Sequence, residues 1–404
     1  MKILQINKFL YHRGGAEKSC LELGQILEEH GHEVAYFSTK DKRNLKTKWN
    51  KYFIKSYDLG NTYNFSTNIK VGFEFIYNFR ARKNLRKLIQ EFRPDIAHLH
   101  NTYHHLSPSI IDELKKNKIP IVLTLRDYKV ICPNRNMEAR GEIWEKSKKH
   151  KYYKCFFDKC IKDSYLRSLL VTIEAYFHWF KKSYGKVDAF ISPSQFLINK
   201  FKEFGFKREI IHLPNPLVNL SDIKKVKIGD YILHFGRLTP EKGVDDLIKA
   251  YNKVDTNLKL YIVGDGSEKS NLEKLAKNNK NIIFTGHKIG NELWDLVKGA
   301  RFLVFSPKWY DNAPRAIIEA MALGKAVVAS RMGGIPEWVH HNKTGFLFKS
   351  GDIKELIKLM NFLLKKDNKF FESIGKNAKE LVYKKNDKDI FYKEIIKIYT
   401  SLVK

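Results

Sequence analysis

Two cations follow a buried strand in the second half of the chain. The apolar run Tyr231–Phe235 leads into Gly236-Arg237-Leu238-Thr239-Pro240-Glu241-Lys242-Gly243, after which a helical pattern begins. A helix N-terminus carries partial positive charge, so Arg237 and Lys242 are poorly placed there unless they share a site with an anion. Arginine can bind a diphosphate through two parallel hydrogen bonds, and lysine adds a point charge. The pattern predicts a diphosphate site, with a solvated turn as the alternative.

Two carboxylates lie further along the chain, with seven residues between them. The run Phe302–Phe305 is followed by a loop that contains Asp311 and continues as Asn312-Ala313-Pro314-Arg315, and Glu319 lies in the opening turns of the next helix. Open α/β sheets bind ligands at the carboxyl ends of their strands, which both carboxylates can face. Carboxylates accept hydrogen bonds from sugar or ribose hydroxyls. The alternative is a helix N-terminus with ordinary acidic residues.

Two glycine turns also follow apolar strands. Gly14-Gly15 comes after Ile3–Ile6, and Gly264-Asp265-Gly266 comes after Leu258–Val263. Glycine lets the backbone approach a phosphate, and a helix N-terminus supplies free N–H donors. Lys269 stands where a G-x-G-x-x-G fingerprint would end, which argues against a nicotinamide enzyme. Plain tight turns explain each glycine motif about equally well.

Two histidines occupy alternate positions of the expected strand Ile96–Leu99 and its continuation. His98 and His100 therefore share a face, and His100, followed by Asn101, is nearer the carboxyl end. We expect either a core histidine that supports the site or a contact with an acceptor or sugar.

The elements that position these motifs are short apolar runs that alternate with helical patterns. One set is 3–6, 34–37, 96–99, 121–125 and 187–191; a second set is 231–235, 258–263, 282–284, 302–305, 326–329 and 345–348. Strands that are apolar on both faces and separated by helices form parallel sheets covered on both sides. The fold class is therefore α/β, with two such units.

The break between the units lies at Pro214-Asn215-Pro216 and the polar stretch 219–227, because two prolines stop regular structure. We expect domains at 1–214 and 217–386, with a helix over 387–404. Asp387 and Asp389 resemble a metal-binding D-x-D motif, but favourable charge at a helix N-terminus explains them better.

The net charge of the chain is +30, from 74 Lys and Arg against 44 Asp and Glu. Nucleic acid, an anionic membrane surface or phosphorylated substrates would each suit that charge. The sequence has no zinc-finger spacing and no RNA-recognition signature, so nucleic acid is the least favoured of these partners.

The four cysteines are too few for a disulfide scaffold and fit a reducing cytoplasm. Cys155 and Cys160, with Cys132 upstream, could form part of a metal site, but their spacing is loose and ordinary thiols are the better interpretation. No signal peptide and no apolar run long enough to cross a membrane is apparent.

Taken together, these motifs resemble the family-4 retaining glycosyltransferases of the GT-B fold over nearly the whole chain. The motifs that carry the resemblance are Gly14-Gly15-Ala16-Glu17, 95–101, 235–238 with 241–243, 263–266, and 319–322 with Gly324. The resemblance implies two Rossmann-like domains facing each other across a cleft, with the C-terminal helix packing back toward the N-terminal domain. The first domain would bind the acceptor and the second a nucleotide-sugar donor.

The resemblance also implies roles for single residues. Arg237 and Lys242 would bind the donor diphosphate and stabilise the leaving phosphate, and Glu319 would hold the ribose hydroxyls. Asp311 and the backbone after it would hold the donor sugar. Glycines would let the backbone approach the donor, at Gly14, Gly15, Gly236, Gly264 and Gly266. The family needs no metal and no cofactor, because cations and helix dipoles neutralise the leaving group.

Two positions depart from the family pattern. Asp311 replaces the glutamate that usually begins the E-x7-E element, and it is one methylene shorter. Arg126, followed by Asp127, stands after the run 121–125, where the family commonly has a histidine near the donor sugar. Arginine cannot reproduce the neutral donor and acceptor character of histidine. These departures keep open a catalytically degenerate relative that only binds nucleotide-sugars; a sugar-nucleotide epimerase is a further alternative.

Two stretches of the first domain, Lys46–Arg86 and Lys146–Lys186, mix aromatic residues with Lys and Arg. Such segments can lie on an anionic bilayer, or they can be amphipathic core helices with solvated outer faces. We expect a lipid-linked or surface-glycan acceptor and a cytoplasmic enzyme that is peripheral on the inner face of the cell membrane.

Overall fold

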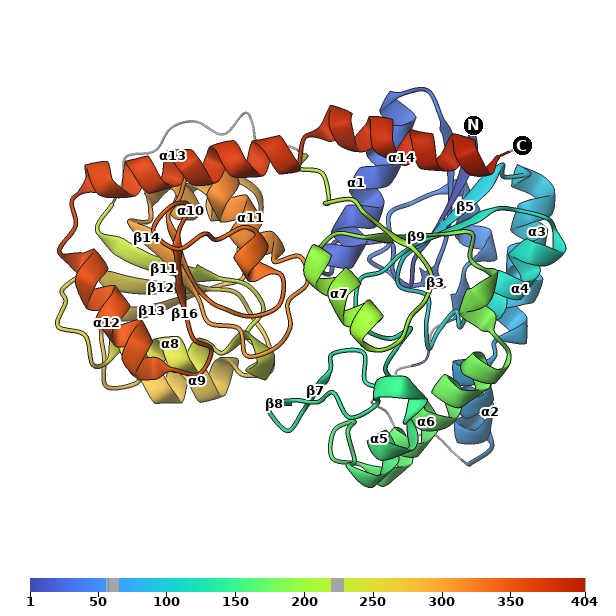
Figure 1. The fold of residues 1–404 in the computed structure, drawn as a ribbon, viewed down its shortest axis with the longest axis horizontal. Coiled ribbons are helices and arrows are strands. Elements are labelled where there is room, and N and C mark those ends of the chain that lie inside the picture. Colours follow the sequence, from blue (N-terminus) through green and yellow to red (C-terminus); the bar gives the residue numbers. More distant parts are fainter. Residues whose placement is uncertain (56, 58–64, 219–228, 404) are drawn as a thin grey trace. The chain divides into compact units, whose positions relative to one another are not determined.

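The computed structural model describes residues 1–55, 57, 65–218 and 229–403 (Figure 1). The polar stretch 219–227 and part of the segment 46–86 lie outside these residues. The chain divides into two compact units. Unit 1 is Met1–Arg140, Trp144–Pro216 and Lys388–Lys404, and unit 2 is Gly141–Ile143 and Leu217–Asp387.

Unit 1 is built on a six-stranded parallel sheet of order β10-β9-β6-β5-β1-β2. Its strands are β1 (Lys2–Ile6), β2 (Glu33–Phe37), β5 (Ile96–Leu99), β6 (Ile121–Thr124), β9 (Ala189–Ser192) and β10 (Ile210–His212). Its helices are α1 (Gly15–Glu29), α2 (Phe65–Ile76), α3 (Phe79–Phe92), α4 (Ser109–Lys116), α5 (Tyr153–Phe157), α6 (Tyr165–Phe180), α7 (Gln195–Glu203) and α14 (Lys388–Leu402). The short strands β3 (Thr39–Lys40) and β4 (Ile54–Lys55) pair separately, and β7 (Glu138–Ala139) is equally short, as is β8 (Glu142–Ile143) of unit 2.

Unit 2 repeats the design with the order β13-β12-β11-β14-β15-β16. Its strands are β11 (Tyr231–Phe235), β12 (Lys259–Val263), β13 (Ile282–Gly286), β14 (Phe302–Phe305), β15 (Val327–Ser330) and β16 (Phe346–Phe348). Its helices are α8 (Val244–Tyr251), α9 (Lys269–Ala276), α10 (Gly290–Gly299), α11 (Arg315–Ala322), α12 (Ile353–Leu364) and α13 (Asn368–Lys385). The predicted α/β class with two parallel-sheet units is confirmed.

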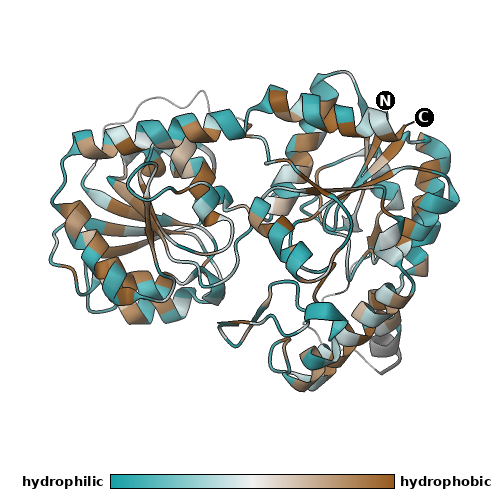
Figure 2. Cartoon of the chain, in the orientation of Figure 1, coloured by the Kyte–Doolittle hydropathy of each residue, from teal (hydrophilic) through white to brown (hydrophobic). Residues whose placement is uncertain are grey.

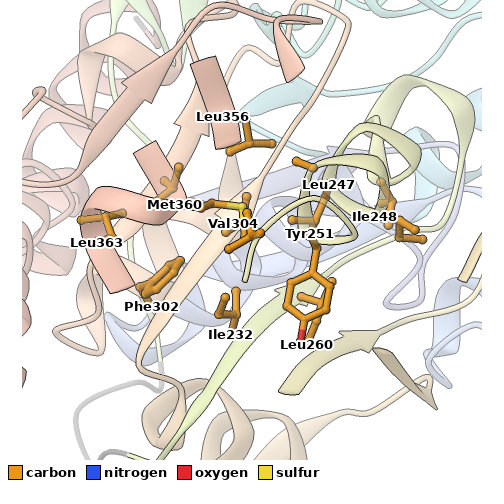
Figure 3. Close-up of a cluster of buried hydrophobic side chains, with 14 of the residues drawn as sticks. Ile232, Leu247, Ile248, Tyr251, Leu260, Phe302, Val304, Leu356, Met360 and Leu363 are labelled. Atoms are coloured by element: carbon orange, nitrogen blue, oxygen red, sulfur yellow. The ribbon is translucent and has the colours of Figure 1, made fainter. Parts of the chain in front are cut away.

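Apolar packing on the sheet holds these layers together. In unit 2, buried side chains of the strands meet α8 and α12, as Figure 3 shows for Ile232, Val304, Leu247, Leu356 and Met360. Figure 2 shows the strands of both units in brown, which marks hydrophobic residues. Burying a Leu, Ile or Val side chain stabilises a fold by roughly 1.5–3 kcal/mol, so the apolar residues of the strands contribute to stability as well as to the pattern.

The predicted helix at the C-terminus is present as α14, and it belongs to unit 1. Its Tyr392 ring stacks on His30 with centroids 3.5 Å apart, and its Tyr399 contacts His98. The preceding helix α13 ends at Lys385 with Asn386 as its C-cap, and the Asn386 carbonyl accepts a hydrogen bond from the Leu217 amide at 3.0 Å.

The expectation of free thiols is wrong for two of the four cysteines. Cys155 and Cys160 form a disulfide, because the turn after α5 brings their Cα atoms within 5.0 Å and the Cys160 amide bonds to the Cys155 carbonyl. Cys20 and Cys132 are free and buried, and burial raises the pKa of each thiol to about 12.

Candidate active site

Lys242 and Asp311, which come from separate motifs, form an ion pair in unit 2. The lysine Nζ lies 2.8 Å from the Asp311 Oδ2 and 5.4 Å from the centre of the Trp309 ring. Lys242 ends the 3-10 turn Pro240–Lys242 after β11, whereas Asp311 follows β14. Because β11 and β14 are parallel neighbours in the sheet, the loops at their carboxyl ends meet.

Arg237 lies in the same loop as Lys242 but is held loosely. Its side chain is 59% exposed, and its nearest carboxylate oxygen, on Glu241, is 3.9 Å away. Among the described residues, no hydrogen bond or ion pair joins Arg237 to Lys242. The guanidinium is therefore positioned at the carboxyl end of β11 with its donors mostly facing solvent, as a phosphate-binding group requires.

Glu319 is buried inside α11, one turn after Arg315. The Arg315 Nε donates a hydrogen bond of 2.9 Å to the Glu319 Oε1. Asn312 and Pro314 are buried in the loop that precedes the helix, and Ala313 is half-buried between them. The structure thus gathers the predicted stretch 311–319 at the carboxyl end of β14.

A pair of glycines that the sequence reasoning missed supports Asp311. Gly333 has a φ of +61°, and a Cβ there would lie 2.4 Å from the Asp311 carbonyl oxygen. The amide of Gly334 donates a 2.7 Å hydrogen bond to that same oxygen. Gly333-Gly334 follows the strand β15, so the rule that was applied to Gly14-Gly15 could have found it.

Gly264 holds the β12 turn against the β11 turn. Its φ is +148°, and a Cβ there would lie 1.9 Å from the carbonyl oxygen of Gly236.

We expect Gly264→Ala to lower the free energy of unfolding by more than ~1 kcal/mol, because the cost of an incompatible backbone angle adds to the cost of a backbone clash. Urea unfolding checks this, with Gly286→Ala as the control, since Gly286 has a φ of +73° but open space around it. Equal losses of unfolding free energy in Gly264→Ala and Gly286→Ala would contradict the close approach of Gly264 to Gly236.

In unit 1, the glycine motif lies where a helix begins. The helix α1 starts at Gly15, with Gly14 as its N-cap, and both glycines are exposed. The first-turn amides of a helix have no partner within the helix, so this end of α1 suits an anion.

His100 and Arg126 are joined in a polar network under the carboxyl ends of β5 and β6. Arg126 donates through its Nη2 to the His100 Nδ1 at 3.3 Å and through its Nη1 to the side-chain oxygen of Asn215. The His100 Nε2 then lies 2.8 Å from the Gln5 Oε1. Burial, followed by the neighbouring His98 and Arg126, lowers the pKa of His100 well below its usual value. His100 is therefore neutral and orients Arg126.

His98 is a core residue. Its ring is buried, stacks on His100 at 4.5 Å, and contacts the Tyr399 hydroxyl at 2.5 Å and the Thr124 hydroxyl at 2.6 Å. Burial lowers its pKa to about 3. Gln5, Thr124 and Tyr399 were not predicted, because no local motif links residues so distant in sequence.

Asp127 and Asn101 meet at Tyr103. The Tyr103 hydroxyl donates to Asp127 and lies 3.4 Å from the Asn101 side-chain oxygen. Burial raises the pKa of Asp127.

Two basic residues of the β1–α1 loop were also missed. The Lys8 Nζ and the Arg13 Cζ lie 4.9 Å and 4.5 Å from the centre of the Phe9 ring. Burial, followed by the charges of Arg135 and Arg13, lowers the pKa of Lys8 to about 7. Arg13 stands directly before Gly14-Gly15 and Lys8 stands two residues after β1, and these positions were the available signal.

Within the described part of the chain, no group of three or more His, Cys, Asp and Glu side chains could hold a metal ion. Likewise, none of the described helices is long and apolar enough to cross a bilayer.

Comparisons with known proteins cover both units. The model of Glycosyltransferase Family 4 matches residues 13–221, and that of Glycosyl transferases group 1 matches residues 221–381. An uncharacterized 42.6 kDa protein in the cps region of Klebsiella pneumoniae is 27% identical over 352 residues, 83% of this chain and 87% of its own. The N-acetyl-alpha-D-glucosaminyl L-malate synthase of Bacillus anthracis is 25% identical over 381 residues, 92% and 89% of the two chains. The crystal structure of Anabaena Alr3699/HepE in complex with UDP-glucose matches with a TM-score of 0.65 at 18% identity, over 99% of this chain and 100% of that one, a likeness in fold.

Proposed function

Because the chain belongs to glycosyltransferase family 4, we propose that it is a retaining enzyme that moves a hexose-type sugar from a nucleotide-sugar to a lipid-linked or surface-polysaccharide acceptor. The observation that carries the proposal is the pairing of Lys242 with Asp311 beside the exposed Arg237. This arrangement places two cations and a hydroxyl-binding carboxylate at the carboxyl ends of adjacent strands. We infer that the donor is a UDP-sugar, supported by the UDP-glucose bound to the Anabaena protein.

In this proposal, transfer breaks the bond between the anomeric carbon and the diphosphate oxygen and forms a bond between that carbon and an acceptor hydroxyl oxygen, whose proton passes to the departing diphosphate. Negative charge develops on the leaving phosphate, and Arg237 and Lys242 stabilise it without a metal. Asp311 keeps Lys242 in place and accepts hydrogen bonds from the donor sugar. Glu319, itself oriented by Arg315, accepts hydrogen bonds from the ribose hydroxyls.

In unit 1, we assign the acceptor to the loops after β1, β5 and β6. Gly14 and Gly15, at the start of α1, would instead let the backbone approach the donor phosphates, and Arg13 adds positive charge beside them. Arg126, held by the neutral His100, takes the place of the family histidine and would contact the sugar or its phosphate. We place the enzyme on the cytoplasmic face of the cell membrane, because the net charge of +30 suits an anionic leaflet.

A thermal-shift series with UDP, GDP, ADP and their sugars tests the donor. A ligand at 100 times its dissociation constant adds about 2.7 kcal/mol to the free energy of unfolding. We expect a rise in Tm with UDP and its sugars that is lost in Arg237→Ala. No shift with any of these nucleotides would contradict the proposed donor site.

The second candidate is a degenerate relative that binds a nucleotide-sugar without transferring it, and the replacement of histidine by Arg126 is the observation in its favour. A nucleotide shift combined with no turnover of any donor, even when Arg126→His is tested, would support it. Release of UDP during incubation with a donor and a membrane extract would exclude it.

A further inference from the structure

The helix α6 of unit 1 presents its apolar side to solvent and its polar side to the protein. The exposed side chains are spaced three, four, four and three residues apart, which places them on one helical face, and they are 39–78% exposed: Leu166, Leu169, Ile173, Phe177 and Phe180. The opposite face buries Val171 and four polar residues, namely Ser168, Thr172, Glu174 and His178. A helix on the surface of a water-soluble protein usually buries its apolar side and exposes its polar side. We therefore expect another molecule to cover this stripe.

Neighbouring helices extend the stripe. Both α2 and α5 pack against α6, and Figure 1 shows the three helices together in unit 1. Phe73 of α2, Phe157 of α5 and Phe79 at the start of α3 are 68–71% exposed. The stripe and these three phenylalanines together are the α6 face. In Figure 2 the ribbons of this part of unit 1 carry brown segments, which mark hydrophobic residues.

Positive charge borders the α6 face. The Lys159 Nζ lies 4.4 Å from the Tyr165 ring centre, and the Lys181 Nζ lies 5.4 Å from that of Tyr77. The Tyr77 ring also connects the face to a basic hollow, because its centre is 5.9 Å from Phe177 and 4.9 Å from Phe79.

The basic hollow next to Tyr77 has a volume of about 820 Å³. Six basic side chains and two carboxylates line it, so its net charge is strongly positive. Both carboxylates are already ion-paired, Asp112 with Lys181 and Lys186, and Asp188 with Lys115. Arg82 is paired with Glu113. Lys116 and Arg208 therefore remain without a carboxylate partner among these contacts of the described residues, and their charge suits a phosphate group.

These features favour an anionic bilayer over a second copy of the chain. Two copies that met on this face would bring together two basic borders and two net charges of +30, whereas an anionic bilayer complements both. At 16 residues, α6 is about 24 Å long, shorter than the roughly 30 Å hydrocarbon core, so it suits the plane of the interface.

We propose that the α6 face docks on an anionic phospholipid bilayer, with the stripe in the headgroup boundary and a lipid phosphate in the basic hollow. This inference rests on the proposed peripheral location, but it does not depend on the transfer reaction. The α6 face would bring unit 1 to a lipid-linked acceptor.

Flotation with vesicles tests the docking. We expect the full chain to float with vesicles of equal phosphatidylcholine and phosphatidylglycerol at low salt and to bind pure phosphatidylcholine at least tenfold more weakly. The variant Leu166→Ser/Phe180→Ser should lose roughly tenfold or more in partitioning, because two apolar side chains leave the boundary. The matched control is Ile289→Ser/Phe362→Ser, which changes exposed apolar residues of unit 2 and should bind as the natural chain does.

A second pair of variants tests the hollow. Lys116→Gln/Lys186→Gln should lower partitioning roughly tenfold or more, while Lys354→Gln/Lys358→Gln on α12 should change it much less. Sedimentation of the natural chain and of Leu166→Ser/Phe180→Ser tests the alternative in which a second copy of the chain covers the stripe. A dimer that Leu166→Ser/Phe180→Ser abolishes, with no vesicle binding, would overturn the proposal, as would equal binding to neutral vesicles.

The UDP thermal shift, measured on the same variants, separates the two proposals. An unchanged shift without vesicle binding would refute the docking and leave the donor proposal standing. Vesicle binding without a UDP-induced rise in Tm would refute the donor proposal and leave the docking standing.

Discussion

Replacing Arg237 with alanine is expected to lower kcat by roughly 10²–10³, the usual cost of removing one group that stabilises charge in the transition state. The side chain is 59% exposed and only loosely paired with Glu241, so the fold does not depend on it. We therefore expect Tm without ligand to stay within about a degree of the natural chain, since surface substitutions usually change stability little. Initial rates of UDP release at saturating donor measure the effect.

Two further variants sharpen this test. Arg237→Lys keeps the charge but loses the paired hydrogen bonds, so its kcat should lie between those of the natural chain and Arg237→Ala. Lys274→Ala, which removes an exposed cation from α9, should leave kcat unchanged. A normal rate in Arg237→Ala would remove the proposed phosphate role.

The largest expected loss of stability comes from breaking a buried ion pair in unit 1. The Lys129 Nζ lies 2.6 Å from the Glu174 Oε2, and both side chains are almost fully buried. Lys129→Met would leave the Glu174 carboxylate buried without its main partner, which typically costs about 3–5 kcal/mol. Urea unfolding of the natural chain and the variant gives the difference.

The double variant Lys129→Met/Glu174→Leu is the diagnostic control. It replaces the pair by apolar groups of similar size, which is often neutral, so most of the stability should return. Lys51→Met breaks the exposed pair with Glu91 and should cause no measurable change. A double variant as unstable as the single one would show that packing, and not the unpaired charge, is responsible.

The same pair predicts how stability depends on pH. Burial raises the pKa of Glu174, but Lys129 and His104 outweigh it and bring the pKa down to about 2. Because this pKa is below the unfolded value of about 4.3, the contribution is complete above that value and is lost as pH falls toward 2. His104, lowered by burial to a pKa of about 4, and the nearby His178, also lowered, weaken the fold in the same direction on acidification. Urea midpoints between pH 7 and 3 should fall less in Lys129→Met/Glu174→Leu than in the natural chain.

Local pattern was sufficient for the strands and for the fold class. Runs of residues that are apolar on both faces mark parallel strands, and all but one of the main strands lie where such runs were found. The exception is β10, a three-residue edge strand with little apolar pattern. The family predicted from the ordered motifs is confirmed by the match over residues 13–221. Where each site residue acts remains a prediction.

The sequence by itself therefore determined the two α/β units and the loops in which the chemistry lies, because periodicity and turn residues act over a few neighbours. Only the tertiary structure decided which of those loops meet. Lys242 reaches Asp311 because β14 lies beside β11 although two strands intervene in the chain, and Arg126 reaches His100 because β5 pairs with β6. The disulfide and the outward apolar face of α6 were likewise undetermined, since each depends on where the backbone turns and what packs against it. Strand order and burial are properties of the whole chain, and no local pattern contains them.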